Sequence, residues 1–480
     1  MLGNQIGFAA DPSHGLKGTM NALRNQGTIL LSKEEVEQFN LISDKVQWQA
    51  ILDLVELQKD MEHPINKKLN EGTIKRCSDH FGKMDVQASM QIFHKDTAAG
   101  ISFMVDSGKY PKEYLTTAHF VWQVAHWYEI MSARYVALAF SYKNMEKFDE
   151  QVAWLKTFMR NFIKMIISGR QRVSAAKGTP GAMEVVQKSI LLSGTTTLWL
   201  VPKILADPEV EFYPAGRGLG DPVESHNGVM RMKGKNPTPL QVKRFSKIIC
   251  ISQLMCRIMG SNVPPDDAEF LTEFKNVKKM KEVDKSEDAE DIETFIEVEF
   301  NPGDFSSFED YSERNSLSSF VGYVLWVTIM TKSKCDTCKN ALVDKNEVND
   351  QHLNNLIVDK SWGNSKRVRP TKLGNEIFHV AELIFKEVRD KYYNQKNIRE
   401  RLVNFIHRQI LHRFESSDRT DEIPMCHLRL ILTRFMKGRL FFWADFMNKN
   451  DKNIPVNIEM ENEESFASKS TRSTVIPQLK

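Results

Sequence analysis

Helical periodicity across residues 32–205 constrains the fold of this chain more than any other feature of its sequence. Apolar residues recur at helical spacing from Ser32 to Lys59, and the segment begins with a pattern, Ser32 followed by Glu35, that resembles a capping box. The same spacing returns at 86–104, 116–140, 148–168 and 183–205. An apolar helix face has to be covered by other elements, so this pattern predicts a large helical body.

The composition indicates a soluble, multidomain protein. The chain has 480 residues, enough for roughly two to four domains. Hydrophobic residues make up 41% and charged residues 26%, which is typical of globular cores. The six cysteines do not indicate a disulfide framework and fit a reducing compartment. No apolar run reaches the ~18 residues of a membrane span, and the start shows no signal-peptide pattern. A net charge of +3 does not by itself indicate nucleic-acid binding.

The second half of the chain alternates between helical and irregular segments. Residues 261–298 lose periodicity and turn acidic, which predicts a linker, and the polar end from Asn448 predicts a disordered tail. Helical spacing marks 240–259, 316–330, 377–393, 398–414 and 426–447. The last three of these segments carry basic faces, which a solvated surface or a nucleic-acid contact would explain.

Two carboxylates stand at a predicted helix start near the middle of the chain. Asp221 precedes Pro222, the order expected for an N-cap and a first helical residue. Glu224 would share a helix face with Asp221, and the two repel each other unless a cation, a proton or a basic partner lies between them. Either Asp221 caps the helix and Glu224 in its first turn is stabilised by the helix dipole, or the two are metal ligands.

Another acidic residue follows a short apolar run at the start of the chain. Residues 6–10 predict a strand that ends at Asp11, with Pro12 terminating it and a helix over 16–25 closed by Gly27. An aspartate at the end of a strand is a common metal ligand. The alternative is a turn residue before proline.

Cys335 and Cys338 form a lone CxxC motif in a lysine-rich segment that we expect to be a loop between helices. Two cysteines at this spacing supply half of a tetrahedral zinc site; the alternative is a pair of buried thiols. The nearest candidates for the other half are His407, His412, Cys426 and His427. The sequence contains neither a GxxxxGK[ST] nor a GxGxxG phosphate-binding motif.

Three stretches together resemble the P element transposases and their THAP-domain relatives. Residues 11–17 resemble the family's DPPHLLK segment, and residues 220–231 with 236–238 resemble its QDxLExxFGxIR…NPT segment. Lys68-Leu69, residues 83–86 and residues 87–93 resemble the insertion between them. The order and separations agree over residues 1–260, and residues 300–450 resemble the family's C-terminal region less closely.

The resemblance implies a mixed, mainly α fold. An RNase H-like α/β catalytic domain would be interrupted by a large helical insertion, of the GTP-binding type in the family, and followed by a helical C-terminal domain with the CxxC motif. The expected boundaries are 1–31 and 206–260 for the two parts of the RNase H-like domain, 32–205 for the insertion, 261–300 for the acidic linker, 301–447 for the C-terminal domain and 448–480 for the tail.

The resemblance also assigns roles to the acidic residues. Asp11 matches the second catalytic aspartate, Glu224 the catalytic glutamate, and Asp221 the neighbouring acidic position. In the family, such residues bind Mg²⁺ and drive DNA strand cleavage and transfer. Two-metal phosphodiester chemistry needs several convergent carboxylates, and the long separation of Asp11 from Glu224 requires an insertion between them.

For the nucleotide, the resemblance points to two lysines and one helix of the insertion. Lys68 and Lys83 are the expected phosphate contacts of GTP, with solvated lysines as the alternative. Tyr128 and Glu129 keep the aromatic and acidic characters of the family's Phe-Asp-x-x-Asn element, whereas Ser132 replaces its asparagine.

The chain also departs from the family in ways that leave its enzymatic activity open. The family's first catalytic aspartate lies upstream of the position that Asp11 matches, and none of residues 1–10 is acidic. We therefore expect this chain to lack that aspartate, the THAP domain and the dimerisation segment, and to be inactive alone. The alternative is a host-retained nuclear protein that binds DNA or protein without catalysis. The implied partner is DNA, with a homo-oligomer in the intact family, and the implied location is the nucleus.

Overall fold

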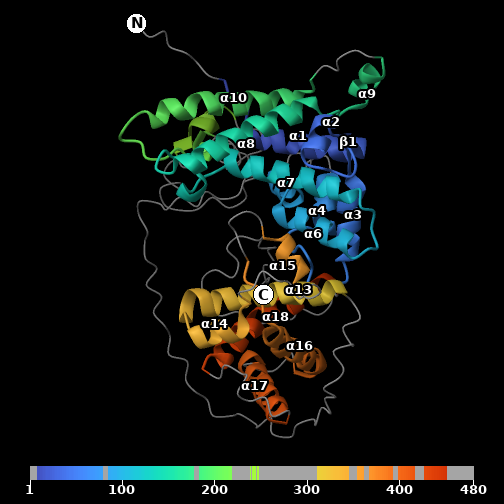
Figure 1. Cartoon of the computed structure of the whole chain (residues 1–480), viewed down its shortest axis with the longest axis vertical. Helices are drawn as coiled ribbons and strands as arrows, with labels where there is room; N and C mark the ends of the chain where they lie inside the picture. Colours follow the sequence, from blue (N-terminus) through green and yellow to red (C-terminus); the bar gives the residue numbers. More distant parts are fainter. Residues whose placement is uncertain are drawn as a thin grey trace.

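The computed structural model describes residues 8–78, 85–177, 183–218, 238, 240–244, 246–247, 311–344, 354–361, 367–392, 398–416 and 426–450. Most of these residues are helical, and they form two packed bodies stacked along the long axis of the molecule (Figure 1). We call residues 8–218 the N-terminal body and residues 311–450 the C-terminal body.

Helix α1 (Pro12–Gln26) begins the N-terminal body. Asp11 is its N-cap: the carboxylate accepts a hydrogen bond from Ser13 N at 2.9 Å, and Pro12 needs no partner at the first position. Gly27, with φ of 66°, ends the helix as predicted. Residues 8–10 are not in a strand, so the expected strand before Asp11 is absent from its described part.

The segment over 32–59, expected to be helical throughout, is interrupted by a strand. Helix α2 (Lys33–Gln38) is capped by Ser32 and is followed by Asn40, whose positive φ of 49° turns the chain. Strands β1 (Thr28–Leu30) and β2 (Lys45–Gln47) then pair antiparallel, with Ile29 opposite Val46. Helix α3 (Trp48–Leu57) follows directly. Burial of Ile29 and Val46 in the core explains why the pairing is favoured over a continuous helix.

Helix α7 lies at the centre of the N-terminal body and is buried on nearly every side. Its neighbours include α6 and α1, and Phe120 and Trp127 are fully buried. A helix that is apolar all round belongs in the interior of a large core. The helices of this part are α4 (Glu71–Ser78), α5 (Val86–Ile92), α6 (Lys95–Asp106) and α7 (Tyr114–Met131).

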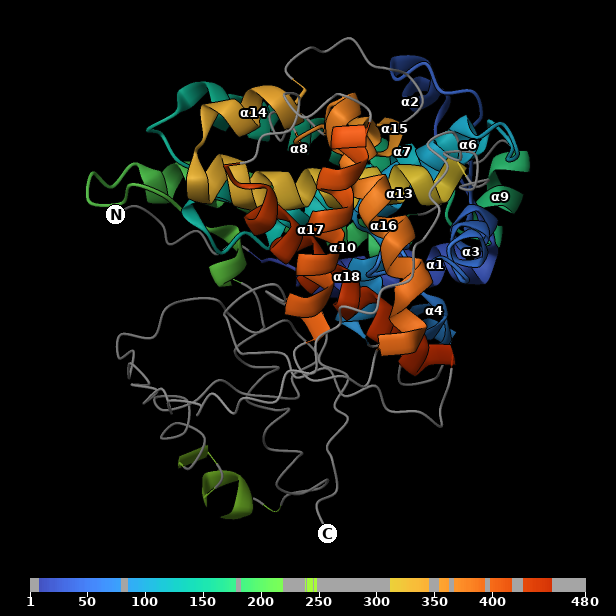
Figure 2. The same cartoon turned by 90° about the horizontal axis from the view of Figure 1, so that it is seen from below.

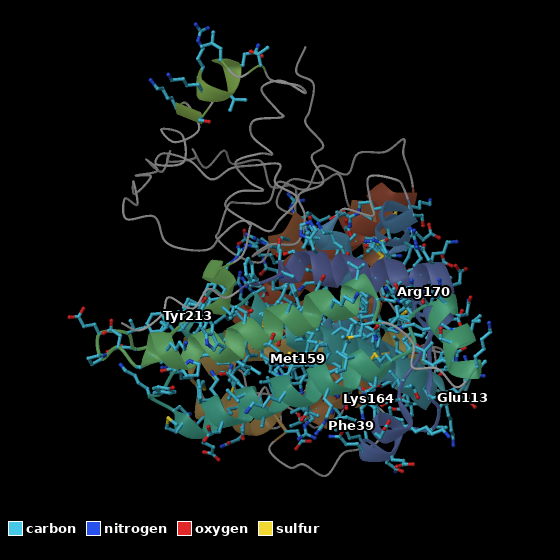
Figure 3. All side chains as sticks on the ribbon, turned by 90° about the horizontal axis from the view of Figure 1, so that it is seen from above. Phe39, Glu113, Met159, Lys164, Arg170 and Tyr213 are labelled. Atoms are coloured by element: carbon cyan, nitrogen blue, oxygen red, sulfur yellow. The ribbon has the colours of Figure 1, made fainter. Side chains whose placement is uncertain are left out.

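The remaining helices of this body cover α1 and α7. Gly194 of α10 faces Met159 of α8, and the missing side chain allows the two helices to approach closely (Figure 3). Phe140 and Tyr213 exchange backbone hydrogen bonds of 3.0 and 2.8 Å, which ties the chain after α7 to the segment after α10. These elements are η2 (Val136–Leu138), α8 (Met145–Lys164), α9 (Gly169–Ala176), α10 (Val185–Leu205) and η3 (Ala215–Gly218).

The C-terminal body is a helical bundle in which α16 and α18 run across α13 (Figure 2). Its core is aromatic, with Phe378, Phe385 and Phe435 fully buried. The CxxC motif lies at the start of helix α14 rather than in the expected loop. The elements are α13 (Tyr311–Leu325), the π-helical η5 (Trp326–Ser333), α14 (Asp336–Leu342), α15 (Asn355–Asp359), α16 (Lys372–Tyr392), α17 (Ile398–Ser416) and α18 (Leu428–Asn450).

The two bodies share a tightly packed interface. Helix α15 packs on α6, and Leu356 is buried within the N-terminal core. Beside it, Arg439 Nε donates to both oxygens of Glu382 at 2.9 and 2.7 Å, and Arg439 also pairs with Glu62 of the N-terminal body. Arg389 donates to Glu62 as well, at 2.5 and 2.6 Å. A buried ionic network therefore joins the bodies.

The mainly helical fold is confirmed, whereas its RNase H-like part stays a prediction. Within the described ranges, the only sheet is the antiparallel pair β1–β2, and no parallel strands are present. Several predicted features lie outside the described residues: Lys83, Asp221, Glu224, the linker expected over 261–300 and residues 451–480. None of the described helices is both long and apolar enough to cross a membrane.

Candidate functional site

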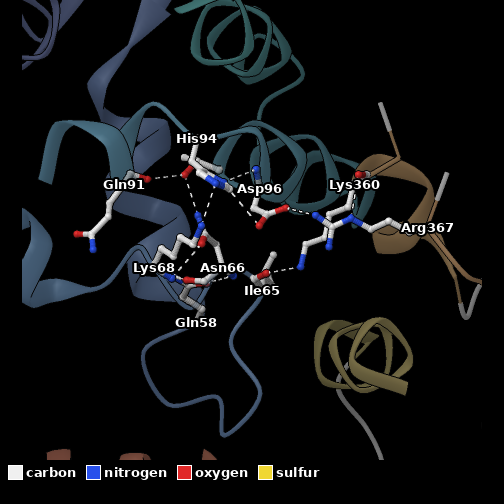
Figure 4. Close-up of polar contacts among 10 residues, drawn as sticks. Gln58, Ile65, Asn66, Lys68, Gln91, His94, Asp96, Lys360 and Arg367 are labelled. Carbon is white, nitrogen blue, oxygen red and sulfur yellow. Dashed lines mark hydrogen bonds and ion pairs between the residues drawn. The ribbon is translucent and has the colours of Figure 1, made fainter. Parts of the chain in front are cut away.

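A cluster of polar and charged side chains lies where the two bodies meet (Figure 4). The N-terminal body contributes the loop at 65–69 and the turn at 94–96 that begins α6. The C-terminal body contributes Lys360 and Arg367. We call this group the junction cluster.

The loop at 65–69 is held in place by a buried amide. Gln58 donates to the carbonyl oxygens of Asn66 at 3.1 Å and Leu69 at 2.5 Å, and accepts from Asn66 N at 2.8 Å. The Asn66 side chain in turn donates to Thr97 at 2.8 Å and accepts from Lys68 N at 3.0 Å. With Gln58 and Asn66 both buried, these bonds fix the backbone that presents the exposed Lys68.

His94 and Lys68 bring two nitrogen atoms to one point. His94 is the N-cap of α6, and its Nδ1 accepts from Asp96 N at 3.0 Å. Burial lowers the pKa of His94 to about 4, which keeps the ring neutral near pH 7. Lys68 Nζ lies 3.1 Å from Nε2. Within the described part of the chain, no carboxylate forms an ion pair with Lys68, so the pair favours an anionic oxygen.

Asp96 anchors the cations of the C-terminal body. Arg367 donates to it at 2.7 Å, and Lys360 donates to the carbonyl oxygen of Ile65 at 2.7 Å. Burial raises the pKa of Asp96, but Lys360, His94 and Arg367 outweigh that effect and lower it to about 2. Burial also lowers the pKa of Lys360 to about 8, against the effect of Asp96. The C-terminal body thus contacts both the loop at 65–69, through Lys360, and the turn at 94–96, through Arg367.

Glu129 of α7 supplies a half-exposed carboxylate near this cluster. Its side chain is 38% exposed and pairs with Lys95 at 2.5 Å and with His126 at 3.5 Å. Burial raises the pKa of Glu129, but the hydrogen bonds from His126 and Lys95 outweigh it and lower the pKa. Glu129 also acts on His94, whose pKa it raises, so the carboxylate lies within electrostatic range of that ring.

The other predicted nucleotide contacts lie elsewhere. Tyr128 is 7% exposed and points into the core, where its hydroxyl lies 3.2 Å from the Ser13 hydroxyl. Ser132 donates to the carbonyl oxygen of Tyr128 at 2.5 Å, at the end of α7. The structure therefore brings Lys68 and Glu129 toward His94, a residue that the sequence analysis did not name. The spacing of His94 and Asp96 at a helix start was the available signal.

Of the three carboxylates predicted to bind the metal, only Asp11 lies in the described part of the chain. One of its oxygens caps α1, and the other lies 3.2 Å from His14 Nδ1. The Asp11 side chain is 18% exposed. A single capping carboxylate does not define a metal site, so no step involving Mg²⁺ follows from this geometry.

The CxxC motif does meet further ligands. Cys335 and Cys338 lie beside Cys426 and His427, and the four ligand atoms all lie within 4.8 Å of one another. His407 and His412 of α17 are not in this group. Two of the four candidates from the sequence therefore complete the set.

The chain shares a domain with a known family. Residues 13–144 match the family described as the TNP-like, GTP-binding insertion domain, so this region is a domain of that family. The match confirms the resemblance to P element transposases in this region.

One solved structure similar to this chain is the Drosophila P element transposase strand transfer complex, at 19% sequence identity and a TM-score of 0.41. The similarity covers 51% of this chain and 51% of the transposase chain, so the match spans about half of the transposase. The chain matches none of the curated proteins with which it was compared.

Proposed function

We propose that the domain of residues 13–144 binds a guanine nucleotide beside Lys68, His94 and Glu129. The observation that carries the proposal is that a fixed loop holds the Lys68 ammonium group 3.1 Å from His94 Nε2, with no carboxylate paired to it in the described part of the chain. The description of the matching domain family supports the choice of nucleotide.

Each part of the proposed site matches one part of the ligand. Lys68 and His94 would donate to phosphate oxygens, where a charged acceptor makes the hydrogen bonds strong. Glu129 would accept from the two N–H groups on the Watson–Crick edge of guanine, a pair of donors that adenine does not present. Lys95, which now neutralises Glu129, would be released toward the phosphates.

Equilibrium titration of the full chain with fluorescent GTP and ATP tests this proposal. Lys68→Ala should weaken GTP binding by roughly 10- to 100-fold, because a hydrogen bond to a charged group contributes about 1.5–3 kcal/mol. Glu129→Gln should reduce the preference for GTP over ATP about tenfold.

The matched control is Lys59→Ala, which removes an exposed lysine that pairs with Glu71. It should leave both affinities unchanged. Wild-type affinity in Lys68→Ala, or an unchanged GTP preference in Glu129→Gln, would contradict the site.

We further propose that this domain works within a P element-type transposase polypeptide. Such a protein would act on DNA in the nucleus as a homo-oligomer, with Asp11, Asp221 and Glu224 as Mg²⁺ ligands for strand cleavage and transfer. The motif order over residues 11–231 supports this function. The alternative is a nuclear protein of the same descent that binds DNA or protein without catalysis.

A DNA-nicking assay tests whether the chain is an active enzyme. We expect the purified chain alone not to nick DNA in the presence of Mg²⁺. Nicking that Glu224→Gln abolishes, and that Glu209→Gln at an exposed position preserves, would overturn this expectation and favour the enzyme over the binding protein.

A further inference from the structure

Three cysteines and one histidine converge at one end of the C-terminal body. Cys335 and Cys338 come from the start of α14, while Cys426 and His427 directly precede α18. The Sγ atom of Cys426 lies 3.7 Å from that of Cys335 and 3.2 Å from that of Cys338. Cys338 Sγ lies 3.6 Å from His427 Nδ1. Residues almost ninety positions apart therefore aim four ligand atoms at one point.

These separations approximate the edges of a zinc tetrahedron. With Zn–S bonds of about 2.3 Å and Zn–N bonds of about 2.0 Å, the edges are roughly 3.8 Å between sulfurs and 3.5 Å between sulfur and nitrogen. The Cys335–Cys426 and Cys338–His427 separations fit these values closely. The Cys338–Cys426 separation is shorter, and a small rotation of the exposed Cys426 side chain would correct it.

The backbone is shaped to present the ligands. Lys334, with a positive φ of 49°, reverses the chain between η5 and α14 and so directs Cys335 back toward α18. Lysine is an unusual residue for this conformation, which is strained for any residue with a Cβ atom. On the other side, the carbonyl oxygen of His427 accepts from Ile431 N at 3.0 Å, which places His427 at the start of α18.

We propose that Cys335, Cys338, Cys426 and His427 bind one Zn²⁺ ion as a closed structural site. Thiolate and imidazole ligands in a tetrahedral set favour zinc over hard cations such as Mg²⁺. Because the protein supplies all four ligands, no position remains open for a substrate or a catalytic water. Three thiolates and Zn²⁺ carry a net charge of −1, and Lys334, Lys339 and Arg429 adjoin the ligands in the sequence.

The site would join two helices that are distant in sequence. Cys338 is fully buried and belongs to the core of the C-terminal body, so the ion would lie at the edge of that core. The proposal is independent of nucleotide binding, since the four ligands all come from residues 335–427, outside the domain of residues 13–144.

Metal analysis of the full chain, expressed with zinc and purified without chelator, tests the proposal. We expect one zinc per chain, and an X-ray absorption spectrum with three sulfurs at about 2.3 Å and one nitrogen at about 2.0 Å. Cys426→Ser should lose the ion without leaving a cavity, because Cys426 is exposed. His427→Cys should retain zinc in an all-sulfur shell. Cys77→Ser, which changes a cysteine buried in the N-terminal body, should keep the wild-type zinc content.

Stability provides a second readout that does not depend on any activity. Removing zinc with a chelator should lower the Tm by roughly 5 °C or more, since a ligand bound to the folded state stabilises it. The same treatment should leave the Tm of Cys426→Ser unchanged. A folded wild-type chain without zinc, whose three thiols react freely or whose Cys338 and Cys426 form a disulfide, would overturn the proposal.

Discussion

At the scale of single residues, Asp359 has the most consequential environment. It lies at the end of α15, where the C-terminal body packs on α6, and its Oδ2 atom is buried without a hydrogen-bond partner in the described structure. Burial, with the nearby Asp106 carboxylate adding to it, raises the pKa of Asp359 to about 7. Folding therefore favours the protonated acid.

This shift makes stability depend on pH in a defined direction. An unfolded aspartate has a pKa of about 3.9, so the contribution of Asp359 to stability is fully present below about pH 4 and is lost as the pH rises toward 7. We predict that Asp359→Asn raises the free energy of unfolding by about 2–4 kcal/mol at pH 8 and changes it little at pH 4.

Urea unfolding across this pH range measures the effect. The control is Asp149→Asn, which changes an exposed residue of α8 and should follow the wild-type curve. A difference between Asp359→Asn and the wild type that is the same at pH 4 and at pH 8 would show that Asp359 ionises normally.

At the scale of elements, a glycine sets the approach of η3 to the end of α7. Gly216 N donates to the carbonyl oxygen of Ala133 at 2.8 Å, and a Cβ atom at Gly216 would collide with the backbone of Ser132 and Ala133. Backbone atoms cannot rotate away as a side chain can. Gly216→Ala should therefore lower the free energy of unfolding by about 1–3 kcal/mol.

Thermal unfolding of the variant tests this prediction. Gly169→Ala is the matched control, because a Cβ atom at the first position of α9 would make only an ordinary contact with the Gln26 side chain, at 3.9 Å, and alanine is the better helix former. It should be neutral or slightly stabilising. Equal Tm values for the two variants would mean that the segment at η3 shifts freely.

The sequence predicted the helices far better than it predicted the pairing between distant segments. Local signals were sufficient for the end of α1, which Gly27 marks, and for α10 and α16, where the apolar period is strong. The start of α1 was predicted wrongly, because the helix begins at Pro12 and not at Leu16. They failed at β2, because its pairing with β1 depends on burial that no local pattern records.

The candidate sites follow the same division. Lys68 and Glu129 came from a family resemblance, and Cys426 and His427 were named as two of four candidates for the zinc site. Periodicity and spacing could not predict the hydrogen bonds from Gln58 to the loop at 65–69, or the role of His94. Both depend on contacts between segments that are distant in the sequence.

At the scale of the whole molecule, the buried ionic network at Arg439 joins the two bodies. The Arg439 side chain and the Glu382 side chain are both 0% exposed. Burial lowers the pKa of Arg439, but Glu382 and Glu62 outweigh that effect and raise it. Burial raises the pKa of Glu382, yet Arg439 outweighs it, so the pKa lies far below its usual range.

Removing the arginine should leave the buried Glu382 carboxylate without its cationic partner, while Glu62 keeps Arg389. We predict that Arg439→Met lowers the free energy of unfolding by about 3–5 kcal/mol, and that adding Glu382→Gln restores part of the loss. Chemical denaturation measures both, with Arg408→Met, at an exposed position of α17, as the control. A loss below about 1 kcal/mol would show that the network is solvated.

The reach of Lys360 and Arg367 across the interface has one more consequence. Both residues belong to the C-terminal body, yet Lys360 donates to the carbonyl oxygen of Ile65 and Arg367 to the carboxylate of Asp96, in the same two segments that carry Lys68 and His94. Binding of an anion at Lys68 would therefore be thermodynamically linked to docking of the two bodies. If docking improves affinity for an anion by some factor, the anion must strengthen docking by that same factor. Binding of an anion to the domain of residues 13–144 would thus change how strongly the C-terminal body docks on it.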